Sequence, residues 1–553
     1  MGKIILVIFL ISQSVFSQDN ITGKKEVTVI ENGILKKKTV ITPAVNSGIN
    51  KEVTVIPPVN SSVQGNNTNV RWSFTDPLST GDFCKVSENG NYNAVSWNLN
   101  TKRISLCNNL SNVPLWEFST DPNTYLSFIS VSDTGGVTAA GSYHNIYLFN
   151  NSGNVPFFNF DLTRLADTGI ATGLDVTSDG RFIVCSVSRE DSSTIFGFNS
   201  SSTSAVWAKR IAPSVTTGGG SVEGVRMSGN DSLVIVNTYA EFFVFRTYTG
   251  ELIHRGLINP GAPANGTQAT MGISGNGSII ATVNYSGFLR VYQWNGTSYV
   301  FLWGNQEPPG SFYNWYTSVD ISYDGQYVAA GTLNFLSSST FDGKVKVFKT
   351  SGSGTPLWTY AGCGDEITAV SFSKNADILA ASSYGEFSNS TEDLYLFKTL
   401  SGNTPFYKLN TPGSLFYCSI SGNGRTVTAS GKAVHARQFG LGGVLYNIDV
   451  DTSSAPVSVS NNSILRENFI LNQNYPNPFN PKTVISYILP SEGFVSLKIY
   501  DALGNEVSTL INKKQNQGSY EVVFDATALS SGVYFYRLES GGYSDVKKFV
   551  LMK

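Results

Sequence analysis

The 553-residue chain carries 38 Lys and Arg residues against 40 Asp and Glu residues, which gives a net charge of −2. This balance excludes the global basic field that nucleic-acid binding requires, so no nucleic-acid partner is expected. Only 14% of the residues are charged, whereas Gly, Tyr and Phe are abundant. Such a composition is typical of turn-rich all-β proteins. The length also exceeds one ordinary core, so we expect several units of β-structure.

The N-terminus has the layout of a secretory signal peptide. Lys3 precedes an apolar run at residues 4–11, and Val15-Phe16-Ser17 precedes Gln18. The run is too short to span a bilayer, and its flanks fit a cleavage site after Ser17. We therefore predict a signal peptide at residues 1–17. No other apolar run reaches the roughly 18 to 20 residues of a membrane helix, so no transmembrane segment is expected.

Residues 18–69 contain a short repeat but little that could form a core. The hexapeptide KEVTVI at residues 25–30 recurs at residues 51–56, and residues 60–69 are polar. Isolated short strands bury too little apolar surface to fold alone. We predict a mostly extended spacer over residues 18–69.

Between residues 70 and 450 a pattern of short strands recurs, with polar turns at regular spacing. Successive turns are 45, 45, 51, 46, 48, 51 and 48 residues apart, counted from the last residue of each turn. A period in the upper forties with four strands per unit is typical of a β-propeller. The last turn residues are Gly90, Gly135, Gly180, Asp231, Gly277, Gly325, Ala376 and Gly424.

The positions six and four residues before these turn residues are apolar in all eight units, as expected for an innermost strand packed between neighbouring blades. Seven units are followed by an aromatic fourth strand, but the eighth is not. Residues 70–74 (VRWSF), which precede the first unit, match the missing strand. We therefore predict an all-β fold: an eight-bladed β-propeller over residues 70–450, closed by this N-terminal strand so that no blade edge stays open.

The chain ends in a different pattern. NYPNPFNP at residues 474–481 is followed by TVISYILP at 483–490, VSLKIYDALG at 495–504 and GVYFYRL at 532–538. The alternation and the glycine turns predict a small C-terminal β-sandwich, joined to the repeats by a linker at residues 451–466. These motifs closely resemble the type A C-terminal sorting domain of the type IX secretion system of Bacteroidetes, here at residues 467–553. The resemblance implies the type IX secretion machinery as a partner and export to the outside or to the outer-membrane surface.

The repeats resemble WD40-like and quinoprotein-dehydrogenase-like propellers, through phrases such as VDISYDGQYVAAG at residues 319–331. The recurring Gly-His and Trp-Asp pairs of strict WD40 repeats are missing. A quinone-dependent dehydrogenase of this kind would contain adjacent cysteines, and none of the five cysteines is adjacent to another. We expect no cofactor and buried thiols at Cys84, Cys107, Cys185, Cys363 and Cys418.

No catalytic or metal site is predicted. The three histidines lie in different repeats without a ligand partner nearby in sequence, and zinc sites need several converging ligands. HExxH, GxSxG and GxxxxGK[ST] are all missing from the sequence.

Two sets of residues are candidates for ligand binding. The first lies between the two apolar positions of the innermost strands and includes Asp175, Arg226 and Asp320; Asp175 and Arg226 are predicted to approach each other near the channel. The alternative is a structural ion pair between blades. The second set is Tyr313, Trp315 and Tyr316, whose rings could stack on sugars or peptides if the loop at residues 308–317 exposes them. The alternative is packing within the loop or the core.

These observations favour an exported binding module for an extracellular protein or glycan. One alternative is an extracellular enzyme, either a polysaccharide hydrolase or lyase or a quinoprotein dehydrogenase. Another is a purely structural surface-layer component. Several carboxylates, or a His with a carboxylate, at one mouth of the channel would favour the enzyme, whereas an aromatic face would favour binding.

Overall fold

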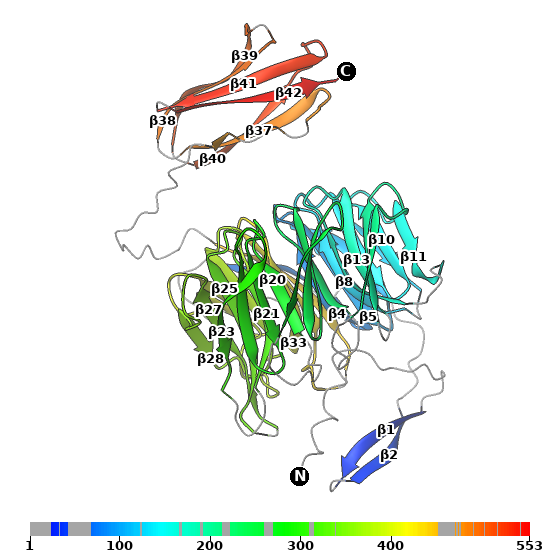
Figure 1. The fold of residues 1–553 in the computed structure, drawn as a ribbon. Helices are drawn as coiled ribbons and strands as arrows, with labels where there is room; N and C mark the ends of the chain where they lie inside the picture. The colour runs from blue at the N-terminus through cyan, green and yellow to red at the C-terminus, as the bar shows by residue number, and fades with distance from the viewer. Residues whose placement is uncertain are drawn as a thin grey trace. The chain divides into compact units, whose positions relative to one another are not determined.

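The computed structural model describes residues 24–31, 34–41, 68–121, 124–164, 169–188, 192–212, 222–258, 269–308, 314–337, 339–438, 440–451, 470–471, 474, 477–489, 492–502, 504–516, 518–541 and 543–552. These residues are nearly all in strands and turns, and their one helical element is a 3-10 turn, η1 (Leu162–Arg164). No helix in the described residues is therefore long or apolar enough to cross a membrane. The chain divides into two compact units, Met1–Ala455 and Pro456–Lys553 (Figure 1).

The described part of the first unit contains eight antiparallel sheets between Asn69 and Asp449, numbered here sheet 1 to sheet 8 by the chain order of their first strands. Sheets 1 to 7 each consist of four consecutive strands paired in order, and sheet 6 also holds the short β26 (Phe341–Asp342) beside its second strand. The first strands are β4 (Ser79–Val86), β8 (Leu126–Val131), β12 (Ile170–Val176), β16 (Val222–Met227), β20 (Ala269–Ile273), β24 (Trp315–Ile321), β29 (Ile367–Phe372) and β33 (Ser414–Ile420).

The second and third strands lie in the middle of each sheet and are the most apolar, because both faces of the sheet are covered. The second strands are β5 (Tyr92–Leu99), β9 (Val137–Ser142), β13 (Phe182–Ser188), β17 (Leu233–Thr238), β21 (Ile279–Asn284), β25 (Tyr327–Phe335), β30 (Ile378–Ser383) and β34 (Thr426–Lys432). The third strands are β6 (Arg103–Asn108), β10 (Asn145–Asn150), β14 (Ser193–Asn199), β18 (Glu241–Arg246), β22 (Phe288–Trp294), β27 (Lys344–Lys349), β31 (Leu394–Lys398) and β35 (Gly443–Asp449).

The fourth strands confirm the predicted pairing of the N-terminal strand. Sheet 8 takes its fourth strand from β3 (Asn69–Asp76), which pairs antiparallel with β35 from Asn69↔Asp449 to Asp76↔Gly443. The strand that precedes the first repeat therefore completes the last sheet. The other fourth strands are β7 (Trp116–Ser119), β11 (Phe158–Asp161), β15 (Trp207–Ile211), β19 (Leu252–Leu257), β23 (Tyr299–Gln306), β28 (Trp358–Ala361) and β32 (Tyr407–Leu409).

The turn between the first and second strands is the same in all eight sheets. Its last residue has a positive φ, including the two positions that are not glycine, Asp231 (58°) and Ala376 (57°). A buried Ser or Thr three residues earlier accepts a backbone hydrogen bond from the start of the second strand, as Ser87 does from Tyr92 N–H (3.1 Å). These side chains satisfy a backbone donor that the tight turn would otherwise leave unpaired. They are Ser87, Ser132, Thr177, Ser228, Ser274, Ser322, Ser373 and Ser421.

The sheets follow one another in a cycle. Each first strand lies beside the first strand of the next sheet, and β33 of sheet 8 lies beside β4 of sheet 1. The space that these eight strands surround is called the axial space below. Six backbone hydrogen bonds of 2.8 to 3.1 Å join neighbouring turns: Asn89 to Asp133, Asp133 to Ser178, Asn230 to Gly275, Gly275 to Tyr323, Lys374 to Gly422 and Gly422 to Glu88. The arrangement is compatible with the predicted β-propeller.

The hydrophobic core of the first unit is divided among the interfaces between consecutive sheets. Eight clusters of buried residues each draw on two neighbouring sheets, from sheets 8 and 1 round to sheets 7 and 8. Thirteen of the sixteen predicted apolar positions in the first strands are buried, and Ile129, Met227 and Ile273 are partly buried. All five cysteines are buried and unpaired, as predicted. Burial raises the pKa of the Cys185 thiol to about 12, so this group is an inert apolar filler.

Within the predicted spacer, the described residues include an antiparallel hairpin of β1 (Lys24–Glu31) and β2 (Ile34–Ile41). Alternating Val, Ile and Thr residues favour strands, and the sequence Asn32-Gly33 between them is a strong hairpin signal. The predicted signal peptide at residues 1–17 lies outside the described residues.

The second unit consists of two antiparallel sheets that share one core. One sheet has the order β36 (Ile470–Leu471), β37 (Lys482–Leu489) and β40 (Gly518–Asp525); the other has the order β39 (Glu506–Gln515), β38 (Gly493–Tyr500), β41 (Gly532–Ser540) and β42 (Tyr543–Leu551). Ile485 and Tyr487 of the first sheet pack with Leu497 and Tyr536 of the second. The three predicted strands correspond to β37, β38 and β41.

Candidate functional site

Asp175 and Asp320, two of the predicted ligand residues, join neighbouring sheets. The Asp175 carboxylate accepts hydrogen bonds from Ser130 Oγ of sheet 2 (2.7 Å) and from Met227 N–H of sheet 4 (2.9 Å). The Asp320 carboxylate of sheet 6 accepts from Phe372 N–H of sheet 7 (2.8 Å). Each carboxylate therefore satisfies a backbone donor of the next first strand.

The same position makes the same kind of link elsewhere in the cycle. Ser371 of sheet 7 accepts from Ile420 N–H, and Ser419 of sheet 8 accepts from Val86 N–H of sheet 1, both at 3.4 Å. Ser419 thus makes the same contact between sheets 8 and 1 that Asp175 makes between sheets 3 and 4. The hydroxyl links are about half an ångström longer than the carboxylate links, and a charged acceptor makes the stronger hydrogen bond.

Arg226, the third of these residues, points to a different partner from the predicted one. Its guanidinium donates a hydrogen bond to the Tyr417 hydroxyl (3.0 Å), from sheet 4 to sheet 8. No ion pair between Arg226 and Asp175 occurs among the described residues. The pKa of Arg226 is raised by Tyr417 first, with smaller contributions from Asp175 and Asp320 and against the opposing effect of burial. The two aspartates are therefore electrostatic neighbours of Arg226 without touching it.

The prediction of exposed aromatic rings in the loop at residues 308–317 is wrong for Trp315 and Tyr316, which are buried. Trp315 is only 8% exposed and stacks on Tyr285 with ring centres 4.6 Å apart. Tyr316 is fully buried and donates to Asn305 Oδ1 (2.5 Å), and burial raises its pKa. The cause is that β24 begins at Trp315, so both rings belong to the interface between sheets 5 and 6 rather than to a loop. Tyr313 lies outside the described residues.

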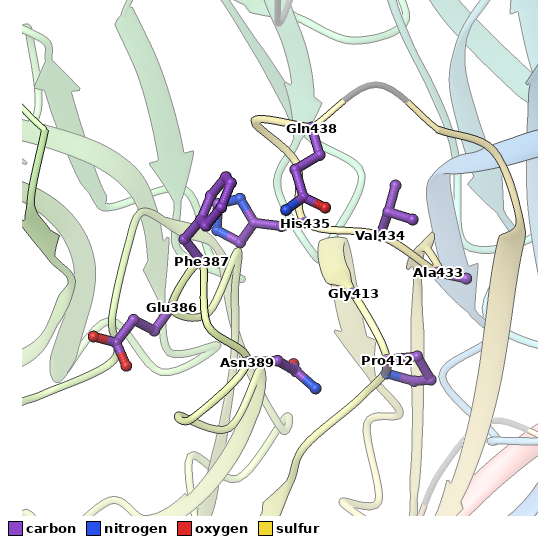
Figure 2. A pocket seen from close by; sticks show the side chains of 9 residues that line it. All are labelled: Glu386, Phe387, Asn389, Pro412, Gly413, Ala433, Val434, His435 and Gln438. Atoms are coloured by element: carbon purple, nitrogen blue, oxygen red, sulfur yellow. The ribbon is translucent and has the colours of Figure 1, made fainter.

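A hollow of about 200 Å³ lies between loops of sheets 7 and 8 (Figure 2). One wall is the loop between β30 and β31, with Glu386, Phe387 and Asn389; the other is the loop between β34 and β35, with His435 and Gln438. Phe387 is 62% exposed, and its ring lies 5.3 Å from that of His435. An exposed aromatic ring beside a recess with polar groups is a candidate ligand contact.

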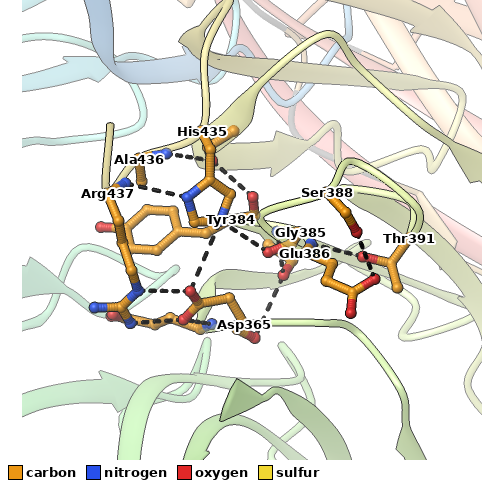
Figure 3. A network of polar contacts seen from close by, with 12 residues as sticks. Asp365, Tyr384, Gly385, Glu386, Ser388, Thr391, His435, Ala436 and Arg437 are labelled. Carbon is orange, nitrogen blue, oxygen red and sulfur yellow. Dashed lines mark hydrogen bonds and ion pairs between the residues drawn. The ribbon is translucent and has the colours of Figure 1, made fainter. Parts of the chain in front are cut away.

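A buried ion pair fixes the loop of the hollow that carries His435 and Gln438. Arg437 donates two hydrogen bonds to Asp365, from Nε and from an Nη, each 2.7 Å (Figure 3). Asp365 is nearly fully buried, and the Arg437 guanidinium also lies 4.0 Å from the centre of the Phe341 ring. This two-point pairing joins the β34–β35 loop of sheet 8 to the segment between β28 and β29, whereas the loop that carries Phe387 is linked to His435 through the Gly385 carbonyl.

His435 is held as a neutral ring whose two nitrogens are both used. Nε2 lies 3.1 Å from the Gly385 carbonyl oxygen and must donate, whereas Nδ1 accepts from Arg437 N–H (3.2 Å). Burial lowers the pKa of His435, which keeps the ring uncharged. Its distance to Asp365 is 3.8 Å, too long for a hydrogen bond. No ring nitrogen is left for proton transfer.

Two acidic groups near the ion pair hold their protons at neutral pH. Burial first, and then Asp365, raises the pKa of Glu366 to about 8, although Arg437 opposes the shift. Burial, followed by Glu366 and Asp365, raises the pKa of the Tyr384 phenol well above its ordinary value. The Tyr384 ring also lies 5.8 Å from Phe416 of sheet 8. Glu366 and Tyr384 therefore add uncharged polar groups beside the Asp365–Arg437 pair.

Aromatic side chains also border the axial space on three consecutive sheets. Phe83 of sheet 1 lies 5.8 Å from Phe128 of sheet 2 and 5.8 Å from Tyr417 of sheet 8. All three are partly exposed. We call Phe83, Phe128 and Tyr417 the aromatic wall.

The neighbouring Asp82 is a bulged residue of β4. Its carboxylate accepts hydrogen bonds from Thr80, Asn98 and the Tyr125 hydroxyl, and burial raises its pKa. A bulge re-aims a side chain that would otherwise alternate with its neighbours. Seven of the eight first strands carry a bulge at the equivalent point, and β20 is regular.

His435 and Asp365 are saturated by structural hydrogen bonds, and the described residues contain no group of three His, Cys, Asp or Glu side chains that could hold a metal ion. The hollow, the loops and the aromatic wall were missed by sequence reasoning. A signal for the wall was present: only Phe83, Phe128 and Tyr417 are aromatic at the position one residue before the first apolar site of each repeat.

Comparison with known protein families gives one finding. Residues 473–552 match the family described as a secretion system C-terminal sorting domain. No curated protein matches the chain. The matched segment corresponds to the second unit, so this unit indicates export by the type IX secretion system to the cell surface or the extracellular space.

Proposed function

We propose that the chain is an exported, eight-bladed β-propeller that acts as a binding module on an extracellular protein or glycan. Three features support eight blades: eight four-stranded sheets, first strands adjacent in a cycle, and β3 as the closing strand. The sorting domain gives the destination, and the first unit carries the binding activity. Closing the cycle with an N-terminal strand leaves no blade with an unpaired third strand.

The ligand site is the hollow between sheets 7 and 8, with Phe387 as its main contact. The observation that carries this assignment is a 62% exposed phenylalanine beside a recess whose two loops are linked by His435 and Gly385, with the His435 loop also held by the buried Asp365–Arg437 pair. In Figure 2 the side chains of Asn389 and Gln438 extend from opposite loops beside the hollow, where their amides are available to a ligand. An aromatic face with a few fixed polar groups is the usual composition of a recognition site.

The alternative of an enzyme draws on the presence of His435 near Asp365. That pair fits a catalytic arrangement in composition only, because Asp365 is bound by Arg437 and both nitrogens of His435 are engaged with backbone groups. A general base needs a free acceptor within reach of the substrate. Binding is therefore the better account of the same residues.

Screening the full-length protein on a glycan and peptide array, followed by Phe387→Ala, tests the proposal. Phe494→Ala is a matched control, since Phe494 is 61% exposed but belongs to the sorting domain. We expect the strongest array ligand to bind at least about tenfold more weakly to Phe387→Ala, in line with the loss of one well-packed aromatic contact, and equally to Phe494→Ala. Equal affinity of both variants, or no ligand on the array, would contradict the assignment.

A further inference from the structure

Arg226 extends into the axial space and is exposed there. It belongs to β16 of sheet 4, and its hydrogen-bond partner Tyr417 belongs to β33 of sheet 8, four sheets away in the cycle of eight. The two side chains therefore meet across the axial space. Arg226 nevertheless keeps an exposed surface although it lies on a first strand. The space around its guanidinium is open to water.

Most of the donor capacity of Arg226 is unused. A guanidinium has five N–H groups, and Tyr417 is the one acceptor within hydrogen-bond distance among the described residues. The nearest carboxylates, Asp175 and Asp320, are engaged with backbone N–H groups of Met227 and Phe372 instead. The planar fork of the guanidinium matches a carboxylate, which can accept two parallel hydrogen bonds.

Aromatic side chains lie on only one side of the axial space near Arg226. The aromatic wall includes Tyr417, the very residue that Arg226 contacts, and continues to Phe83 and Phe128. At the equivalent position the other five sheets carry small residues, namely Gly173, Gly224, Thr270, Ser318 and Ala369. A ligand in the axial space thus meets flat aromatic rings on one side and the guanidinium reaching from the other.

The charge at this level does not repel an anion. Lys85 of sheet 1 and Arg226 are positive, and Asp175 and Asp320 are negative, at equivalent positions of their first strands. The two carboxylates accept hydrogen bonds from protein donors, which offset part of their field. Arg226 presents unused donors to the open space, and Lys85, which is partly exposed, also carries a positive charge there.

We propose that Arg226 and the aromatic wall bind the carboxylate and the ring of an acidic sugar residue, a uronate. The weakly polar face of the sugar ring packs on Phe83 and Tyr417, and the carboxylate replaces the Tyr417 hydroxyl as the partner of Arg226. A neutral hexose offers the same ring without the charged group. This site is separate from the hollow at Phe387 and does not depend on the proposed role of that hollow.

Titration of the full-length protein with D-galacturonate and with D-galactose tests the proposal, because the two sugars differ only at C6. We expect galacturonate to bind at least about tenfold more tightly, and the difference to shrink as salt is raised. Arg226→Gln should abolish the preference, whereas Arg246→Gln, a change at an exposed arginine of the same sheet, should leave it intact. Equal binding of the two sugars would overturn the proposal, and so would binding of a peptide C-terminal carboxylate in place of galacturonate.

Tyr417→Phe gives a second readout that does not remove the arginine. It keeps the ring of the aromatic wall but removes the hydroxyl that competes for Arg226. We expect galacturonate to bind Tyr417→Phe several-fold more tightly than wild type, with the thermal midpoint little changed. Unchanged or weaker binding would contradict the exchange of partners, even if Arg226→Gln failed to fold. Because Phe387→Ala leaves this site intact, the two proposals fail independently.

Discussion

Sheets 8, 1 and 2 are built from the same repeat as sheets 3 to 6. They differ in the residue that stands one position before the first apolar site of the first strand. The first group carries Tyr417, Phe83 and Phe128 beside the axial space, and the second carries only Gly, Thr and Ser there. In sheet 3 a Cβ on Gly173 would lie 2.8 Å from a methyl carbon of Val225, so the neighbouring sheet occupies the space. The hydrogen-bonded frame is thus constant, whereas the room left at its inner edge varies from sheet to sheet.

The two groups also differ in how they are joined. Carboxylates of Asp175 and Asp320 make the short links after sheets 3 and 6, whereas Ser371 and Ser419 make the longer links after sheets 7 and 8. Sheet 8 therefore has the longer hydroxyl links on both of its sides, and the Asp365–Arg437 pair joins it to sheet 7 as well. The following predictions test that difference.

The largest effect is expected at the junction of sheets 8 and 1. Trp97 is fully buried, donates to Ser105 and lies 5.3 Å from Phe74 of β3. Trp97→Ala should lower the free energy of unfolding by about 4 kcal/mol, because it leaves a large cavity in this interface. The equivalent residue of sheet 3 is Val187, and Val187→Ala should cost clearly less, since fewer atoms are removed. Urea unfolding of both variants measures the difference; equal losses would refute a special role for the junction.

The next effect concerns the buried ion pair. Arg437→Ala leaves the carboxylate of Asp365 buried without its partner and should cost about 3 kcal/mol. Arg246→Ala in sheet 4 removes an exposed pair, whose side chains are 56% and 63% exposed, and should change stability by less than about 1 kcal/mol. Thermal unfolding gives both values. If the two variants melted together, Asp365 would have to be solvated or protonated rather than held by Arg437.

A smaller effect separates the carboxylate links from the hydroxyl links. Asp175→Ala removes the two hydrogen bonds that join neighbouring sheets and takes away the side-chain acceptor of Met227 N–H, so we expect a loss of about 2 kcal/mol. Ser419→Ala removes one bond of 3.4 Å and should cost less than about 1 kcal/mol. Both are read from denaturant midpoints. A larger loss for Ser419→Ala would reverse the assignment of strong and weak links.

A further effect, small within any one pH unit, is a dependence of stability on pH that arises at Glu366. Its pKa is about 8 in the folded protein against 4.5 in the unfolded chain, so the folded state holds the proton longer. The stabilising contribution is complete below pH 4.5 and is lost as the pH rises towards 8, by at most about 1.4 kcal/mol per pH unit. The difference in thermal midpoint between wild type and Glu366→Gln should therefore grow between pH 5 and 8. A constant difference would show that Glu366 ionises normally.

Features set by the repeat were predictable from the sequence. The turn spacing located all eight first strands, and the aromatic pattern of residues 70–74 identified the strand that completes sheet 8. Alternating strands with glycine turns predicted the tail, because local periodicity directly reflects which face is buried.

Features set by contacts between repeats were not predictable. Asp365 and Arg437 are 72 residues apart, and nothing in either local sequence indicates their pairing. The aromatic rings of Trp315 and Tyr316 looked like loop residues next to Pro308 and Gly310, but β24 starts earlier than the pattern suggested and buries them. Likewise, Arg226 donates a hydrogen bond to Tyr417 across the axial space and forms no ion pair with Asp175 of the adjacent sheet, because a long side chain can reach the opposite strands.

The pairing of β3 with β35 has a consequence for how the molecule is made. Asn69 and Asp449 are partners, so β3, which is synthesised before all the other strands of the eight sheets, stays unpaired until the last strand of sheet 8 is made. Closing so long a loop costs entropy and slows folding, whereas each sheet forms from neighbours in the chain. A chain interrupted before residue 443 would hold up to seven formed sheets with β3 unpaired and sheet edges open to association. Completion of this one pairing thus distinguishes a finished molecule from an unfinished one before export.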